Sequence, residues 1–157
     1  MQRTLTILTL AAAAALMVPA APASAVDFGI RAGVYDDADS AFVGGELLFQ
    51  LSPRWYFNPN IEYVFVDDGD LFTVNGDFHY DFPVDFDGYV WAGAGAALIS
   101  DDRDLPPRRR DDEQDNDFGL NLLGGVGWKV NGMVPYVQGK LIVADDNEAV
   151  LGVGLRF

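Results

Sequence analysis

The feature that most constrains this chain is an alternation of apolar and polar side chains, which recurs in eight runs between residues 27 and 157. A period of two is typical of β-strands, because successive side chains point to opposite faces of a sheet. No stretch carries the 3.6-residue period of an amphipathic helix. The predicted strands are 27–35, 41–51, 54–66, 71–82, 86–99, 118–130, 133–143 and 148–157.

The length of these runs indicates a bilayer. Most have about 9–13 residues, which is what a tilted strand needs to cross a membrane. Alternation alone also fits a soluble barrel, so the choice between the two depends on other features. Pro59 lies inside the third run and has no N–H to donate. We therefore expect a bulge or irregular pairing at 58–60.

The connections between the runs alternate in character. The connections at 36–40, 67–70, 100–117 and 144–147 are rich in Asp, whereas those at 52–53, 83–85 and 131–132 are compact. Outer-membrane barrels have longer outside loops and short periplasmic turns. With eight strands, both ends of the barrel domain then fall on the side of the short turns.

Charge and aromatic residues support the membrane alternative. The chain is 50% hydrophobic yet carries a formal net charge of −14, and most of its acidic residues lie in the four Asp-rich connections. Aromatic residues near strand ends predict two belts flanking an aliphatic band. The predicted belts are Phe28, Trp55, Phe57, Phe82, Phe86, Trp128 and Phe157 on the turn side, and Tyr35, Phe65, Phe72 and Phe118 on the loop side.

The first 25 residues read as a cleaved signal peptide. Arg3 precedes an apolar stretch rich in Leu and Ala, and Ala23-Ser24-Ala25 fits the small-x-small cleavage rule. The chain has no cysteine, so disulfides do not hold the secreted domain together. We predict cleavage after Ala25 and one domain over 26–157, an eight-stranded antiparallel up-and-down transmembrane β-barrel.

On this architecture the chain resembles the small outer-membrane β-barrel family, which includes the OmpA transmembrane domain, OmpX and OmpW-like proteins. The sharpest part of the resemblance is the run 149–157, AVLGVGLRF. A final Phe preceded by apolar residues at alternate positions looks like the signal that this family presents to the barrel-assembly machinery. The resemblance thus implies an assembly signal at Leu151, Val153, Leu155 and Phe157, and the outer membrane of a Gram-negative-type bacterium.

The polar face of the strands predicts a lumen network. Eight strands enclose a space just wide enough for side chains to fill, and buried charges must be paired there. We interpret the network as a structural plug, with a narrow ion path as the alternative. Its predicted members are Arg31, Glu46, Gln50, Glu62, Asn75, Asp77, His79, Asn121, Lys129, Gln138, Lys140 and Arg156, with Asn58 and Asn60 beside them.

The loops suggest surface chemistry. Clustered carboxylates attract divalent cations such as Ca²⁺ or Mg²⁺, and Arg108, Arg109 and Arg110 suit the phosphates of lipopolysaccharide. A chain this acidic should not bind nucleic acid. His79 is the only histidine and no serine is expected to reach it, so we predict no enzyme, cofactor or dedicated metal site.

The function that the sequence favours is a monomeric outer-membrane barrel in contact with membrane lipid. Its role would be structural or one of surface interaction through acidic extracellular loops. A narrow ion-conducting channel is the first alternative. A soluble periplasmic β-barrel that binds a small apolar ligand is the second.

Overall fold

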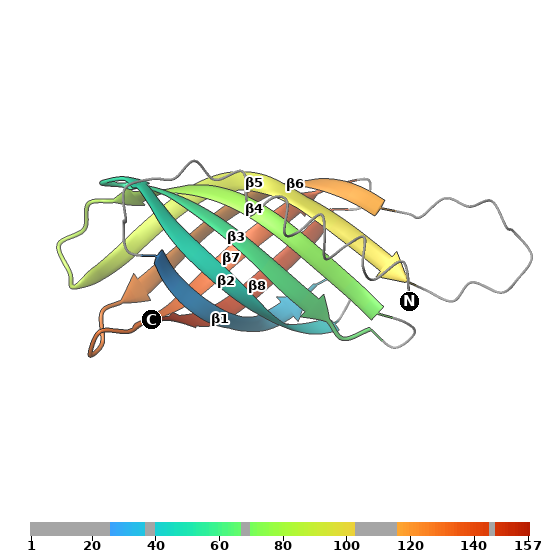
Figure 1. The fold of residues 1–157 in the computed structure, drawn as a ribbon, viewed down its shortest axis with the longest axis horizontal. Helices are drawn as coiled ribbons and strands as arrows, with labels where there is room; N and C mark the ends of the chain where they lie inside the picture. Colours follow the sequence, from blue (N-terminus) through green and yellow to red (C-terminus); the bar gives the residue numbers. More distant parts are fainter. Residues whose placement is uncertain (1–25, 37–39, 67–69, 103–115, 145–146) are drawn as a thin grey trace, which may run out of the picture.

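The computed structural model describes residues 26–36, 40–66, 70–102, 116–144 and 147–157 (Figure 1). Eight strands form in chain order, which confirms the predicted all-β class and places every strand end within three residues of its expected position. Across the described ranges, no helix is long and apolar enough to span a membrane. The strands are β1 Val26–Tyr35, β2 Ser40–Ser52, β3 Trp55–Val64, β4 Asp70–Phe82, β5 Gly88–Asp102, β6 Asn116–Trp128, β7 Val134–Val143 and β8 Glu148–Arg156.

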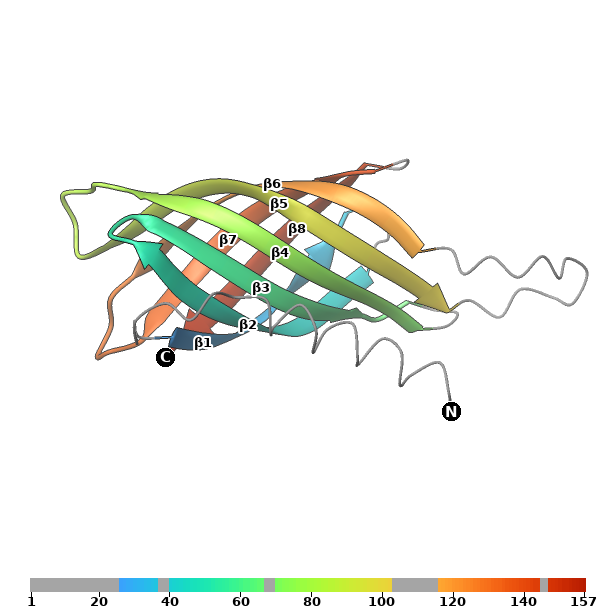
Figure 2. The same cartoon turned by 45° about the horizontal axis from the view of Figure 1, so that its top comes forward.

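The sheet closes on itself. Each strand pairs antiparallel with its neighbours in sequence, and β1 also pairs with β8, from Gly29↔Arg156 to Tyr35↔Val150. Figures 1 and 2 show the strands inclined around a common axis. Closure leaves no strand edge unpaired, which is the condition for a sheet to lie in hydrocarbon.

The two ends of the barrel differ. At one end, here called the turn end, β2 joins β3, β4 joins β5 and β6 joins β7. The last of these is a two-residue turn in which Asn131 and Gly132 have φ of 50° and 83°, while Val130 and Met133 exchange backbone hydrogen bonds of 2.8 and 2.9 Å. Positive φ at both central residues is the geometry of the hairpin turns whose twist matches that of the strands.

The opposite end, here called the loop end, joins the remaining strand pairs. The predicted acidic loops lie mostly outside the described residues, as do Arg108, Arg109 and Arg110. The predicted signal peptide, residues 1–25, lies outside them too and stays a prediction.

Pro59 does not distort the barrel as expected. On the β4 side the pairing runs without a break through Pro59↔Gly76. On the β2 side the same register holds at Glu46↔Asn60 and at Phe49↔Phe57, so no residue is inserted between them. The side-chain amide of Asn58 donates to the carbonyl oxygen of Leu47 at 2.8 Å. The expected bulge at 58–60 is therefore wrong, but the expected irregular pairing is present, because Asn58 and Pro59 have no paired residue on β2. The β2–β3 register itself shifts between Gln50 and Ser52, beside the turn.

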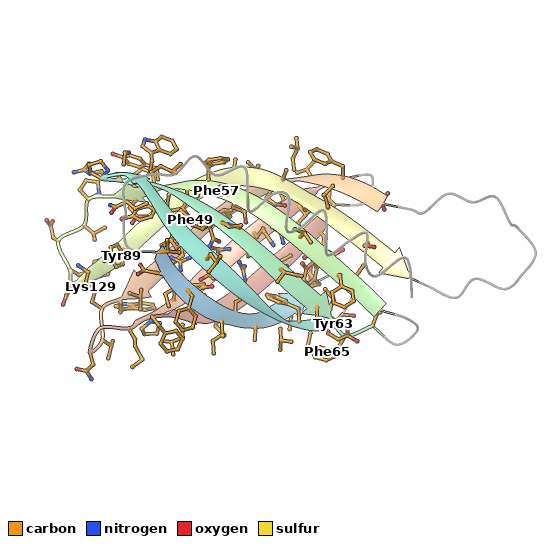
Figure 3. All side chains as sticks on the ribbon, viewed as in Figure 1. Phe49, Phe57, Tyr63, Phe65, Tyr89 and Lys129 are labelled. Carbon is orange, nitrogen blue, oxygen red and sulfur yellow. The ribbon has the colours of Figure 1, made fainter. Side chains whose placement is uncertain are left out.

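The exterior of the barrel carries exposed apolar side chains on all eight strands. Figure 3 shows side chains standing outward from the ribbon in one view. Large hydrophobic side chains from all eight strands stand 38–60% exposed, among them Ile30, Leu47, Ile61, Phe78 and Leu122. The outer ends of the strands carry aromatic rings, including Trp55 and Trp128 at the turn end and Phe65, Phe72 and Phe118 at the loop end. Tyr35 does not belong to the loop-side belt as predicted, because its side chain points into the lumen and is only 3% exposed.

Candidate functional site

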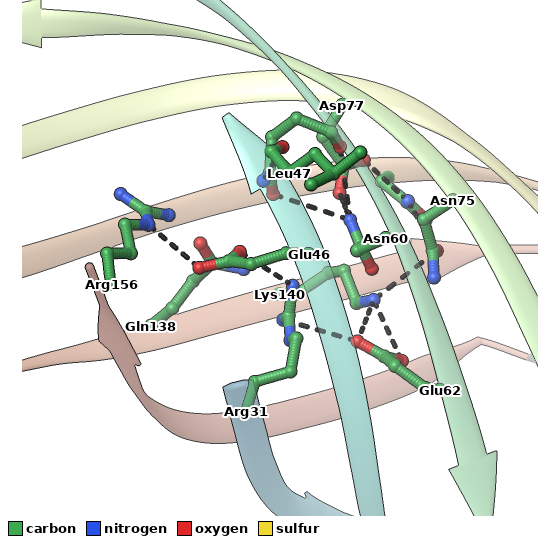
Figure 4. A network of polar contacts seen from close by, with 12 residues as sticks. Arg31, Glu46, Leu47, Asn60, Glu62, Asn75, Asp77, Gln138, Lys140 and Arg156 are labelled. Atoms are coloured by element: carbon green, nitrogen blue, oxygen red, sulfur yellow. Dashed lines mark hydrogen bonds and ion pairs between the residues drawn. The ribbon is translucent and has the colours of Figure 1, made fainter. Parts of the chain in front are cut away.

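The lumen is the candidate site, because the polar side chains of the barrel converge there. Among the described residues, three basic and three acidic side chains are buried, together with a set of amides. They come from seven of the eight strands, and Figure 4 shows how closely they converge. Buried charges of this kind stay ionised only if they are paired and hydrogen-bonded.

Glu62 on β3 lies at the centre of the network. Lys140 Nζ on β7 contacts its two carboxylate oxygens at 3.1 and 3.2 Å, and Arg31 Nη2 on β1 contacts Oε1 at 3.2 Å. Thr73 on β4 donates to Oε2 at 3.1 Å, and the Tyr35 hydroxyl donates to the same oxygen. One carboxylate therefore connects four strands that are separated by up to 78 residues in sequence.

Glu46 on β2 holds the second group of charges, nearer the turn end. Arg156 Nε on β8 donates to its Oε1 at 2.8 Å, and Arg31 Nη1 lies 3.7 Å from its Oε2. The Arg31 guanidinium therefore lies between Glu46 and Glu62. The Arg156 guanidinium also lies over the rings of Trp91 and Tyr136, 4.9 and 4.5 Å from their centroids.

Asp77 on β4 is held by amides. Asn60 Nδ2 donates to it at 3.0 Å and Asn121 Nδ2 at 2.7 Å. Asn121 also donates to the Oδ1 of Asn75 at 2.9 Å, and Lys140 Nζ donates to the same oxygen at 3.3 Å. The amides thus join the third carboxylate to the group around Glu62, so the network braces opposite walls of the barrel.

Most of the predicted lumen residues are brought together. The structure buries Arg31, Glu46, Glu62, Asn75, Asp77, His79, Asn121, Gln138, Lys140 and Arg156 inside the barrel. Gln138 accepts a bond from Trp91 Nε1 at 3.2 Å. His79 lies 3.4 Å from Asp81 and stacks on Tyr56. Gln50 is only half-buried, near the turn end, where it donates to the Tyr56 hydroxyl at 3.1 Å.

Lys129 is wrongly placed by the sequence pattern. It has the inward parity of Asn121, but β6 ends at Trp128, so the side chain lies beyond the strand (Figure 3). The Lys129 side chain is 49% exposed, 3.8 Å from Asp87, and packs over the ring of Tyr89 at 4.9 Å. Without it, the buried set balances at three basic and three acidic residues.

Sequence reasoning missed several lumen residues. Thr73, Tyr35 and Trp91 take part in the network, and a layer of apolar side chains fills the lumen at the loop end. The alternation could have placed Thr73 in the lumen, because it has the same parity as Asn75 and Asp77 on β4. The apolar lumen residues were not predicted, because inward side chains were expected to be polar.

The residues of the predicted assembly signal lie on the exterior of the barrel. Leu151, Val153 and Phe157 are more than two-fifths exposed, and Leu155 is half-buried. The Phe157 ring stacks on Phe28 at 5.0 Å, and its backbone N–H donates to the Phe28 carbonyl at 2.9 Å. The last residues are thus fastened to β1. Their role in assembly stays a prediction.

The soluble alternative does not fit this geometry. A barrel that carries an apolar ligand in water would be polar outside and hollow inside, whereas this one is apolar outside and filled with polar and apolar side chains. Within the described ranges no three acidic, histidine or cysteine side chains gather in a way that could hold a metal ion. The acidic loops that favoured divalent cations are mostly outside those ranges.

Comparison with known proteins gives a likeness of fold. No protein-family model matches the sequence, and no curated protein matches it. The N-terminal β-barrel domain of OprF from Pseudomonas aeruginosa superposes with a TM-score of 0.68 at 14% identity, covering 84% of this chain and 95% of that one. For Neisserial surface protein A the TM-score is 0.57 at 15% identity, covering 83% of this chain and 92% of that one.

A third neighbour is named as a membrane protein. The outer membrane protein Ail of Yersinia pestis, solved in a phospholipid bilayer nanodisc, superposes with a TM-score of 0.50 at 12% identity, covering 85% of this chain and all of the other. What the chain shares with all three neighbours is the closed eight-stranded barrel, and its own exterior is apolar. The chain therefore has the fold of these small eight-stranded barrels, which is the fold that its sequence predicts.

Proposed function

We propose that the protein is a monomeric outer-membrane barrel with a structural or surface-interaction role and a lumen that conducts no ions. One observation carries this proposal: the described interior is filled by side chains, a network of paired charges and amides together with a layer of buried apolar residues. Such a lumen gives rigidity, and a rigid barrel is a suitable base for segments presented at the cell surface.

The surface role rests on the loop end. Asp36 and Asp117 are exposed there, and the sequence adds most of its remaining acidic residues to the same connections. Carboxylates at the outer leaflet would bind divalent cations and, through them, the phosphates of lipopolysaccharide. We therefore propose outer-membrane lipid and lipopolysaccharide as the immediate partners, with no affinity for nucleic acid.

Assembly is the second part of the proposal. The outward apolar residues of β8, with Phe157, would form the signal that the barrel-assembly machinery binds. Deleting Phe157 should then reduce membrane insertion more than deleting residues 103–114. Equal insertion of the two variants, measured as the heat-modifiable fraction in outer membranes, would count against the signal.

The experiment that tests display uses two epitope insertions in the full chain, produced in a Gram-negative host. One insertion lies within 103–115 and the other lies between Asn131 and Gly132. Antibody added to intact cells should bind the first and not the second, while permeabilised cells should bind both. Heat-modifiable gel mobility of the outer-membrane fraction serves as the folding control.

Two outcomes contradict the proposal. If the turn insertion is detected on intact cells and the loop insertion is not, the barrel has the opposite orientation. If the folded protein is recovered as a soluble monomer without detergent, it is not a membrane barrel.

A further inference from the structure

The lumen is divided into two chemically distinct parts. At the loop end, seven buried apolar or aromatic side chains from seven strands form one layer, here called the septum. Its members are Tyr35, Phe42, Val64, Leu71, Ala97, Ile142 and Val150. The eighth strand, β6, contributes Gly119, where a Cβ would lie 2.6 Å from Ile142 Cγ2. All eight strands therefore take part, and the layer extends around the whole lumen.

Phe42 is the largest purely apolar side chain of the septum and is only 1% exposed. Its ring contacts Tyr35 edge-on, with the centroids 5.4 Å apart. A Cβ on Gly33 of β1 would lie 2.6 Å from the ring, and one on Gly152 of β8 would lie 3.4 Å from it. The ring therefore occupies space that two neighbouring strands leave free by carrying glycine.

The charged network begins directly below the septum. The Tyr35 hydroxyl reaches down to Glu62, and the Arg31 guanidinium carbon lies 5.9 Å from the centroid of the Phe42 ring. From this level to the turn end, the lumen is lined by polar side chains and by the cluster of Trp91, Leu123 and Tyr136. Several polar atoms there, including Arg31 Nε and Gln138 Nε2, have no hydrogen-bond partner among the described residues. Buried polar atoms of this kind are normally satisfied by ordered water.

The turn end opens into a small polar cavity. It measures about 40 Å³ and is lined by Asp27, Leu48, Tyr56, Asp81, Tyr89, Val134 and Arg156. At about 10–15 Å³ for each water, this space holds roughly three water molecules. Arg156 Nη2 has no partner in the protein and belongs to a residue that both lines this cavity and bonds Glu46. Water can therefore reach the network from the turn end.

We propose that the septum, rather than the salt-bridge network, closes the lumen to ions. An ion that enters the network can exchange its hydration shell for carboxylates, amides and guanidinium groups. The septum offers no such ligands along its apolar side chains, and apolar constrictions block conduction by excluding water. The proposal rests on the non-conducting barrel of the proposed function and names the element that makes it non-conducting.

The test is single-channel recording of the full protein in planar bilayers. Phe42→Ala removes the ring from the septum and should produce discrete current steps that the parent protein lacks. Ile142→Ala opens the septum from the other wall, beside Gly119, and should do the same. Leu123→Ala is the matched control, because it removes a buried apolar side chain that belongs not to the septum but to the separate cluster with Trp91 and Tyr136. It should remain silent, as should Glu46→Gln in the network.

The outcomes separate the two proposals. Steps in the parent protein would overturn the proposed non-conducting function itself. A silent parent, together with silent septum variants that keep heat-modifiable mobility, would overturn the septum alone. Steps from Glu46→Gln with Phe42 intact would assign closure to the salt bridges instead. If Phe42→Ala does not fold, Ile142→Ala decides by the same criteria.

Discussion

Ile61 and Glu62 are neighbours on β3, yet one is 48% exposed and apolar while the other is fully buried and charged. The same contrast recurs along β4, where outward Phe78 lies between inward Asp77 and His79. In a soluble barrel the polarity of the two faces would be reversed. The comparison teaches that each face must match its own surroundings: the exterior must tolerate hydrocarbon, and the lumen must satisfy every charge that it buries.

The largest effect is expected where a lumen charge loses its counterion. Glu62→Gln leaves Lys140 and Arg31 with a neutral partner in a buried site, and breaking a buried pair costs about 3–5 kcal/mol. The free energy of unfolding in lipid vesicles, followed by tryptophan fluorescence, measures the loss. Asp117→Asn, at the exposed loop end of β6, is the control. A loss under about 1 kcal/mol would show that the lumen charges need no pairing.

A charge placed on the outer face should cost slightly less. Leu122 lies at the middle of β6, and its side chain is 54% exposed on the outer face of the barrel. Leu122→Arg should lower the free energy of unfolding by about 2–4 kcal/mol, the range for basic residues at mid-membrane on a barrel exterior. Leu122→Val keeps the face apolar and should change it little. Equal stability of the Arg and Val variants would refute a lipid-facing exterior.

One substitution can be made on both faces. Gly33→Ala in the lumen would place a Cβ 2.1 Å from the Leu151 carbonyl oxygen and 2.6 Å from the Phe42 ring. Overpacking of this kind costs about 1–3 kcal/mol. Gly139→Ala on the exterior has no atom within 4 Å of its new Cβ and should leave stability unchanged or slightly raised. Parallel urea titrations compare them, and equal losses would mean that the lumen is looser than the contacts indicate.

The smallest effect is expected at Lys129. Its ammonium group is exposed beyond the end of β6 and lies 3.8 Å from an Asp87 that is itself exposed. Lys129→Met should change the free energy of unfolding by no more than about 1 kcal/mol, as is usual for surface ion pairs. Lys140→Met, which removes a buried cation from Glu62, provides the contrast in the same assay. A similar loss in the free energy of unfolding from both variants would indicate that Lys129 lies in the lumen after all.

The strands and the facing of their side chains could be predicted because a period of two is a local property of the sequence. The residue at which a strand ends depends less on the local sequence. Lys129 was therefore predicted to lie in the lumen, because it has inward parity, but it lies one residue past the end of β6. Tyr35 was assigned to the exterior belt because aromatic residues at strand ends are common there. It has the inward parity of Arg31 on the same strand, however, and its hydroxyl donates to Glu62 in the lumen.

Pro59 and the septum were missed for related reasons. A proline in a strand predicts a bulge, but the register holds on both sides of it. Predicting the septum requires knowing which inward residues lie at the same height along the barrel axis. Strand tilt and register determine that height. Phe42 and Val64 are paired directly between β2 and β3, but Ile142 on β7 joins them only because the barrel closes.

The seam between β1 and β8 has a consequence for how the chain folds. The first strand has a neighbour on one side as soon as β2 forms, but its other edge stays open until the last strand arrives. Contacts between such distant segments are slow to form, and an open edge can pair with another chain in the meantime. Closure is therefore the step at which aggregation competes with folding, and the stacking of Phe157 on Phe28 helps to complete it.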